Sequence, residues 1–101
     1  MSVLVTLRVP AKGDLLEQAA KGDADLLAPV VVKAKAHGLI AHHFWASQNE
    51  ILVVDEWPDE ASFQAFFEAS PEIAGIMAKA GATGEPQVEF WRKLDVGDDV
   101  G

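Results

Sequence analysis

The chain has 101 residues, half of them hydrophobic, which is enough for one buried core and too few for two comfortable domains. Its formal net charge of −8, with eight lysines and arginines spread along the sequence, excludes a nucleic-acid partner, because such binding depends on clustered basic residues. The lack of cysteine excludes disulfides and thiolate chemistry, and the lack of both a secretion signal and an ~18-residue apolar run predicts a cytoplasmic protein with no membrane span.

The first part of the chain is predicted to form one strand and two helices. Residues 3–9 alternate, with branched hydrophobic residues at the odd positions, as in a strand. Asp14 can cap a short helix, and residues 24–38 form a second helical stretch. Pro29 either kinks that helix or lies in its first turn, and Gly38 is placed to end it in the left-handed conformation.

The second part of the chain begins with a predicted hairpin. Residues 39–47 and 50–57 are strand-like runs, joined by a polar tip at residues 48–49. Asp59 then caps a helix with an aromatic stripe, and Ser70 is placed as the N-cap of another helix. Both helices carry apolar residues at the spacing of one helical face, so both should pack on the core.

Residues 87–94 alternate as a last strand, and residues 95–101 are too polar and glycine-rich to require order. The element order is therefore β-α-β-β-α-β, which predicts a ferredoxin-like α+β fold with four antiparallel strands and helices on one face. We expect a single domain over residues 1–94, followed by a flexible acidic tail over residues 95–101.

The two hairpin strands are apolar on both faces, whereas a sheet with one face in water alternates apolar with polar residues. No remaining element of the chain can cover the second face. A second copy of the chain is the simplest cover, so we expect a homodimer with the two sheets packed face to face. The residues expected at that interface are His43, Trp45, Leu52, Val54 and Glu56.

The hairpin also provides a geometric argument for a site. With residues 48–49 at its tip, His42 lies opposite Asp55, on the face that also carries Trp57. Asp55 would then fix the imidazole tautomer, which makes His42 a general base able to take a phenolic proton. Alternatively, the two residues are a structural pair that satisfies two buried polar groups, with Trp57 as core. A three-residue loop would shift the register and separate them.

A metal site is not expected on this hairpin. Adjacent residues of a strand point to opposite faces, so His42 and His43 cannot chelate one ion. The sequence also contains no glycine-rich phosphate loop and no zinc-binding spacing.

The segment ILVVDEWPDEASFQAFFEASPEI, residues 51–73, has a hydrophobic strand ending in tryptophan, a capped aromatic helix, and Ser-Pro-Glu opening another helix. It resembles the dimeric α+β barrel superfamily, and within it the antibiotic biosynthesis monooxygenase-like domains. The resemblance covers Val3 to about Leu94 in element order. In its heme-degrading branch an asparagine and a histidine stand where this chain has Thr6 and Met77, so heme chemistry is not expected.

The resemblance implies a cleft between sheet and helices that binds a planar aromatic ligand for oxygenation without a bound cofactor. We expect His42 and Asp55 to be catalytic, and the ligand to contact Trp57, Phe44, Phe66, Met77 and Thr6. The competing hypothesis is a non-catalytic ligand-binding or assembly module of the same fold. An open cleft of roughly 300 Å³ or more would favour ligand binding. A cleft collapsed around Phe66 and Met77 would oppose it.

Overall fold

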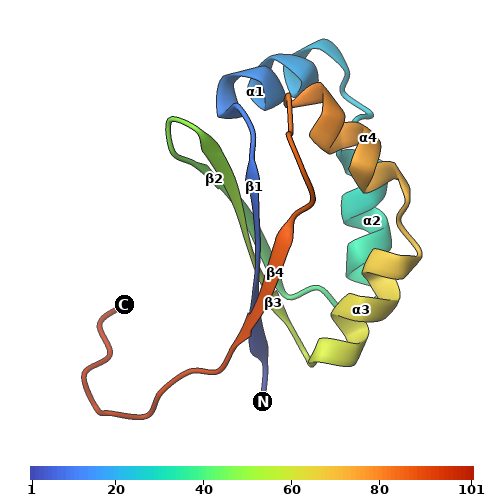
Figure 1. The fold of residues 1–101 in the computed structure, drawn as a ribbon. Coiled ribbons are helices and arrows are strands. Elements are labelled where there is room, and N and C mark those ends of the chain that lie inside the picture. The colour runs from blue at the N-terminus through green and yellow to red at the C-terminus, as the bar shows by residue number, and fades with distance from the viewer.

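A computed structural model describes residues 1–101 and contains one four-stranded sheet with all its helices on one face (Figure 1). The sheet is antiparallel throughout, in the order β2-β3-β1-β4. Its strands are β1 (Val3–Pro10), β2 (Ala41–Ala46), β3 (Glu50–Trp57) and β4 (Gln87–Trp91). The helices are α1 (Gly13–Gly22), α2 (Ala28–Ala36), α3 (Glu60–Glu68) and α4 (Glu72–Lys79). The predicted ferredoxin-like α+β fold is confirmed.

The hairpin of β2 and β3 has the predicted register. His42 lies opposite Asp55, and Phe44 lies opposite Val53. The Ser47 N–H donates to the Glu50 carbonyl at 3.0 Å, which closes a two-residue tip. Because β3 also pairs with β1, the site residues of β3 lie on a central strand with both edges hydrogen-bonded.

Two groups of buried side chains hold the helices on the sheet. One is built around Trp57, Phe63 and Phe66, and the other around Ile51 and Ile76. Each large side chain removed from water contributes about 1.5–3 kcal/mol, so these groups account for much of the attachment of the helix layer. Two half-buried residues, Val30 and Phe44, pack against both groups and mark the place where they meet.

Several predicted helix ends are confirmed. The Asp59 carboxylate accepts from the Ser62 N–H at 2.7 Å and caps α3, and this hydrogen bond lowers the pKa of Asp59. Pro29 lies in the first turn of α2, where its missing N–H costs no hydrogen bond. Gly38 has a φ of +106° directly after the end of α2, and a side chain there would also crowd Pro58.

Three helix starts differ from prediction. α1 begins at Gly13 with Lys12 at its N-cap position, so Asp14 lies in the first turn and does not cap the helix. α2 begins at Ala28, four residues later than expected, because the Asp25 N–H donates to the Asp23 carboxylate in a turn that precedes the helix. Ser70 does not cap α4, whose N-cap position is Pro71. Its buried hydroxyl instead donates back to the Phe66 carbonyl at 2.7 Å, at the end of α3.

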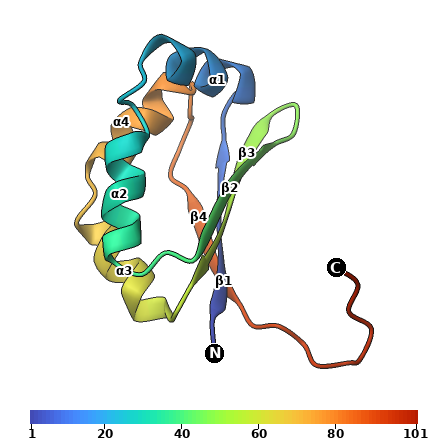
Figure 2. The same cartoon turned by 180° about the vertical axis from the view of Figure 1, so that it is seen from behind.

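The last strand is shorter than predicted. It ends at Trp91, and residues 92–101 leave the sheet without helix or strand (Figures 1 and 2). Lys93 and Asp99 form an exposed ion pair at 2.9 Å within this segment. Among the helices, none combines the length and the apolar character that crossing a bilayer demands.

Candidate functional site

A cavity of about 80 Å³ lies between the sheet and the helices, where the two buried groups meet. Of its 18 lining residues, 15 are hydrophobic, and the other three are His42, Asp55 and Pro86. Strands β1, β2 and β3 form its floor, and α2, α3 and α4 form its roof. The only polar side chains in contact with this apolar space are therefore the histidine and the aspartate of the hairpin.

The His42 imidazole is fixed by hydrogen bonding and by packing. Its Nδ1 lies 2.7 Å from Oδ1 of Asp55, which is only 5% exposed. A carboxylate can only accept, so Nδ1 carries a proton, and in the neutral form of the imidazole Nε2 is the acceptor. The Phe44 ring meets the imidazole edge to face at a centroid distance of 4.8 Å. The tautomer and the orientation of the ring are thus both set by neighbours on the same face.

The second imidazole nitrogen remains available to a ligand. Nε2 of His42 makes no hydrogen bond within the chain, whereas every fully buried side-chain nitrogen and oxygen has a partner. Nε2 is therefore not enclosed by protein, and His42 lines the cavity. A ligand hydroxyl group that came within reach of this nitrogen would find an acceptor without a partner in the chain.

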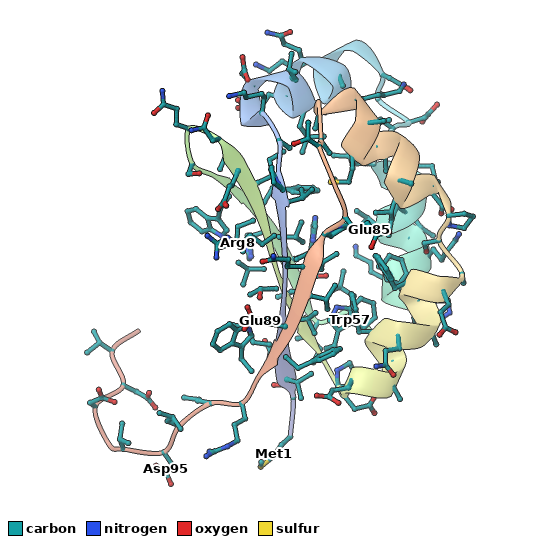
Figure 3. The ribbon with its side chains drawn as sticks, viewed as in Figure 1. Met1, Arg8, Trp57, Glu85, Glu89 and Asp95 are labelled. Atoms are coloured by element: carbon teal, nitrogen blue, oxygen red, sulfur yellow. The ribbon has the colours of Figure 1, made fainter.

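Trp57 holds the Asp55 side chain by a second hydrogen bond. Its Nε1–H donates to Oδ2 of Asp55 at 3.2 Å, so each carboxylate oxygen of Asp55 accepts one N–H bond. The indole is fully buried against Phe63 and Phe66, with ring centroids 5.8 and 5.3 Å away. Figure 3 shows it between the sheet and the helices. Trp57 does not line the cavity, which differs from the expectation that it would stack on a ligand.

The other expected ligand contacts divide between the two faces. Phe44, Phe66 and Met77 line the cavity. The placement of Thr6 was wrong, because strand alternation turns it to the outer face, where its hydroxyl accepts from Trp91 Nε1 at 2.9 Å. The cavity is also smaller than the roughly 300 Å³ that ligand pockets usually reach, since phenylalanine and methionine side chains occupy part of the space.

Sequence reasoning did not assign the part of the wall that α2 supplies. Val30, Val31 and Ala34 line the cavity from this helix, and Leu39 lines it from the loop that follows. The apolar run APVVV was visible in the sequence. It carries no chemical motif, so only its position over the sheet reveals its role.

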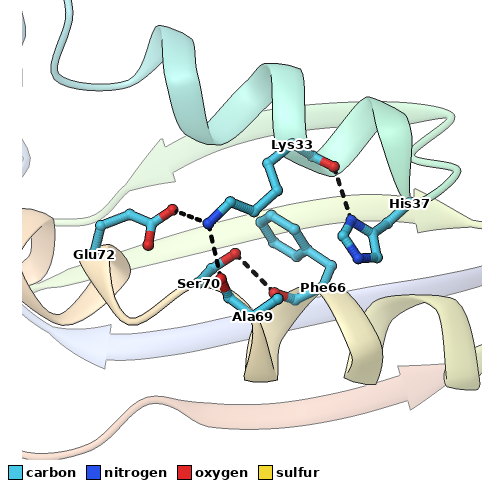
Figure 4. A network of polar contacts seen from close by, with 6 residues as sticks. All are labelled: Lys33, His37, Phe66, Ala69, Ser70 and Glu72. Atoms are coloured by element: carbon cyan, nitrogen blue, oxygen red, sulfur yellow. Dashed lines mark hydrogen bonds and ion pairs between the residues drawn. The ribbon is translucent and has the colours of Figure 1, made fainter.

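A polar clamp joins α2 to the junction of α3 and α4 (Figure 4). Lys33 Nζ donates to the Ala69 carbonyl at 2.8 Å and to Glu72 Oε1 at 2.6 Å. The hydrogen bond from Lys33 is the main reason that the pKa of Glu72 lies below its ordinary value. Because the three helices form the roof of the cavity, this clamp holds the roof together at its outer surface.

The outer face of the sheet carries the residues expected at a dimer interface. His43 lies opposite Val54 and Trp45 lies opposite Leu52, so these side chains share the face away from the helices. Trp45 is 62% exposed in the single chain. Arg8 lies on the same side, where it pairs with Glu50 at 2.9 Å (Figure 3).

No protein-family model matches the sequence, and no curated protein matches it. Solved structures do match the fold. A monooxygenase from the gene ActVA-Orf6 of Streptomyces coelicolor, in complex with the ligand Nanaomycin D, is 16% identical, with 97% of this chain and 93% of that chain covered and a TM-score of 0.67. SnoaB, a cofactor-independent oxygenase from Streptomyces nogalater, is 12% identical, with 97% and 98% covered and a TM-score of 0.62.

A third solved structure is a dimeric ferredoxin-like protein from an uncultured marine organism. It is 18% identical, with 98% of this chain and 93% of that chain covered and a TM-score of 0.61. At these identities the similarity is one of fold. The chain therefore has the fold of the antibiotic biosynthesis monooxygenase-type, ferredoxin-like proteins, as predicted from residues 51–73.

Proposed function

We propose that this chain is a small monooxygenase-like protein that binds a planar aromatic ligand between sheet and helices and oxygenates it without a bound cofactor. One observation carries the proposal. The only polar side chains that line an otherwise apolar cavity are His42 and Asp55, and the buried carboxylate of Asp55 fixes the imidazole tautomer. A general base for a phenol requires this arrangement, namely an oriented imidazole at the edge of an apolar site.

The chemistry needs dioxygen as the only oxidant. His42 takes the phenolic proton, and the resulting phenolate gives an electron to dioxygen. The radical pair combines at the ring carbon para to the oxygen, forming a carbon–oxygen bond, and the imidazolium returns its proton to the peroxide. Loss of the ring hydrogen with the outer peroxide oxygen then releases water. Phenol and dioxygen thus give a para-quinone and one water molecule.

The described activities of two structural neighbours support the proposed reaction. SnoaB is described as a cofactor-independent oxygenase, and the ActVA-Orf6 monooxygenase was solved with Nanaomycin D. A similar activity for this chain is part of the proposal. It is supported by the hydrogen bonds that join His42, Asp55 and Trp57 in this chain.

The proposal includes a homodimer formed through the outer face of the sheet, with His43, Trp45, Leu52, Val54 and Glu56 at the interface. The large exposed area of Trp45 supports it, and so do the exposed Trp91 and Leu4 on the same face. A structural neighbour with this fold is described as dimeric. Pairing two such faces would remove all three side chains from water.

A second candidate function is a non-catalytic ligand-binding or assembly module. The observation that favours it is the cavity volume of about 80 Å³, with Phe66 and Met77 in its wall. In that case His42 and Asp55 are a structural pair, and the chain would show no oxygen chemistry of its own.

Oxygen consumption with alpha-naphthol distinguishes the two candidates. The wild type should consume dioxygen and form the para-naphthoquinone, and His42→Gln should lower the rate by about 100-fold or more, as expected for loss of a general base. His43→Gln is the matched control, because it changes the adjacent histidine on the outer face. Equal rates for His42→Gln and the wild type, or no turnover with any electron-rich phenol, would contradict the proposed reaction.

A further inference from the structure

A second hollow adjoins the cavity and is open to the surface. It has a volume of about 390 Å³ and lies between α4 and residues 82–86, the segment that leads into β4. Phe67, Ile73, Met77 and Pro86 line both spaces. The cavity and this outer hollow therefore share these four residues as a common wall.

The wall can open without unfolding a helix. Met77 is half-buried, and its unbranched thioether changes rotamer at low cost. The backbone beside it is fixed, because the Ala82 N–H donates to the Met77 carbonyl at 3.1 Å and the Thr83 N–H donates to the Pro10 carbonyl at 3.0 Å. Movement of side chains alone would join the cavity to the outer hollow, whose volume lies in the usual range of ligand sites.

The charges around the two spaces restrict what they can hold. Glu85 is the only charged residue that lines the outer hollow, and no lysine or arginine lines either space. Lys33, the cation of the helix clamp, is already bonded to Glu72 and the Ala69 carbonyl. An anionic substituent would find no cation in either space and would lie near Glu85 in a chain of net charge −8.

We propose that the cavity and the outer hollow form one site for a phenol or naphthol whose second substituent is neutral or cationic. The hydroxyl-bearing ring lies in the cavity at His42, and the substituent lies in the outer hollow beside Glu85. Aromatic acids, sulfates and phosphates are poor ligands of this site. This inference rests on the proposed function for the position of the hydroxyl group, and it adds the route of entry and the ligand class.

Three probes of equal ring size test the inference by titration into isotope-labelled protein, followed by amide chemical shifts. They are alpha-naphthol, an aminomethyl alpha-naphthol and a carboxy alpha-naphthol. The amine should bind roughly fivefold more tightly than the carboxylate at low salt, the effect expected for one partly exposed charge contact. Glu85→Lys should invert this order. Glu17→Lys makes the same charge change at an exposed position of α1 and should leave the order of the affinities unchanged.

The outcomes separate this inference from the proposed function. If the carboxylate binds as tightly as the amine, or if Glu85→Lys leaves the order unchanged, the ligand class is overturned although binding at His42 survives. If probes bind and shift the His42 amide but not residues 82–86, the outer hollow is overturned. If no probe binds at millimolar concentration, both the inference and the proposed function fail.

Discussion

On the helix-facing side of the sheet, His42 is bonded to a buried carboxylate, whereas His43, the next residue, is exposed on the outer face. The first histidine has a fixed tautomer and opens on an apolar cavity. The side chain of His43 makes no hydrogen bond within the chain, and it lies among the residues proposed for the dimer interface. The surroundings of each histidine are therefore decided by the face of the sheet on which it lies, and a substitution on one face should leave the other unchanged.

The largest expected effect comes from removing the buried acceptor. Asp55→Ala leaves the His42 Nδ1–H and the Trp57 Nε1–H without partners, and each buried unsatisfied donor costs about 1–3 kcal/mol. The free energy of unfolding, measured by urea denaturation, should fall accordingly. Glu56→Gln, one residue along on the outer face, is the control and should change it far less. Equal losses of unfolding free energy in the two variants would show that Asp55 stabilises the fold no more than a residue of the outer face.

On the outer face, Trp45→Glu should separate the subunits. A charge at the centre of an apolar interface is costly to bury, whereas Trp45 is exposed in the single chain and its replacement should leave the fold intact. Sedimentation of the wild type at micromolar concentration should give about twice the 10.8 kDa chain mass. The variant should sediment as a monomer. A wild-type monomer would refute the interface.

A smaller effect is expected for Trp57→Phe, which keeps an aromatic ring and removes the donor to Asp55. Loss of that hydrogen bond costs about 0.5–1.5 kcal/mol, with a further cost for the vacated ring volume. Because the Trp57 donor holds Asp55 in place, its loss should move the imidazole nitrogen chemical shifts of His42. Phe63→Leu disturbs the same packing without touching Asp55, so the His42 shifts should stay close to those of the wild type. Identical imidazole spectra for wild type and Trp57→Phe would deny Trp57 a positioning role.

The smallest effect concerns the helix layer. Hydrogen bonds lower the pKa values of Glu72 and Asp59, so both carboxylates stabilise the folded state above their ordinary pKa values. That contribution is lost as the pH falls through the lowered pKa values of the folded state, so for Glu72 the loss occurs below about pH 4.5. Thermal melting across this range should show a flatter acid decline for Glu72→Gln than for the wild type. An unchanged profile would mean that the clamp contributes nothing measurable.

The fold could be predicted from the sequence because its determinants are local. Strand alternation, the polar hairpin tip and the Asp59 cap each act within a few residues, and the tip alone fixes the pairing of His42 with Asp55. Ser70 shows the limit of such rules, since its hydroxyl bonds back to Phe66 rather than capping the helix ahead. A serine between two helices can serve either one, and only packing decides.

The candidate site was predictable only in part, because its remaining features depend on distant contacts. The second hydrogen bond of Asp55, from Trp57, depends on how the indole packs against α3. The cavity volume depends on how far Phe66 and Met77 fill the space below α2. Thr6 was misplaced because its position was carried over from a family pattern, whereas alternation along β1 assigns it to the outer face.

The most direct test of the central claim follows His42 and His43 together in isotope-labelled protein while alpha-naphthol is added. If His42 is the acceptor for a phenolic hydroxyl, its Nε2 resonance should shift in a saturable way and the His43 resonances should remain still. A saturable shift of His43 with no change at His42 would contradict the account, because it would place the ligand on the outer face of the sheet.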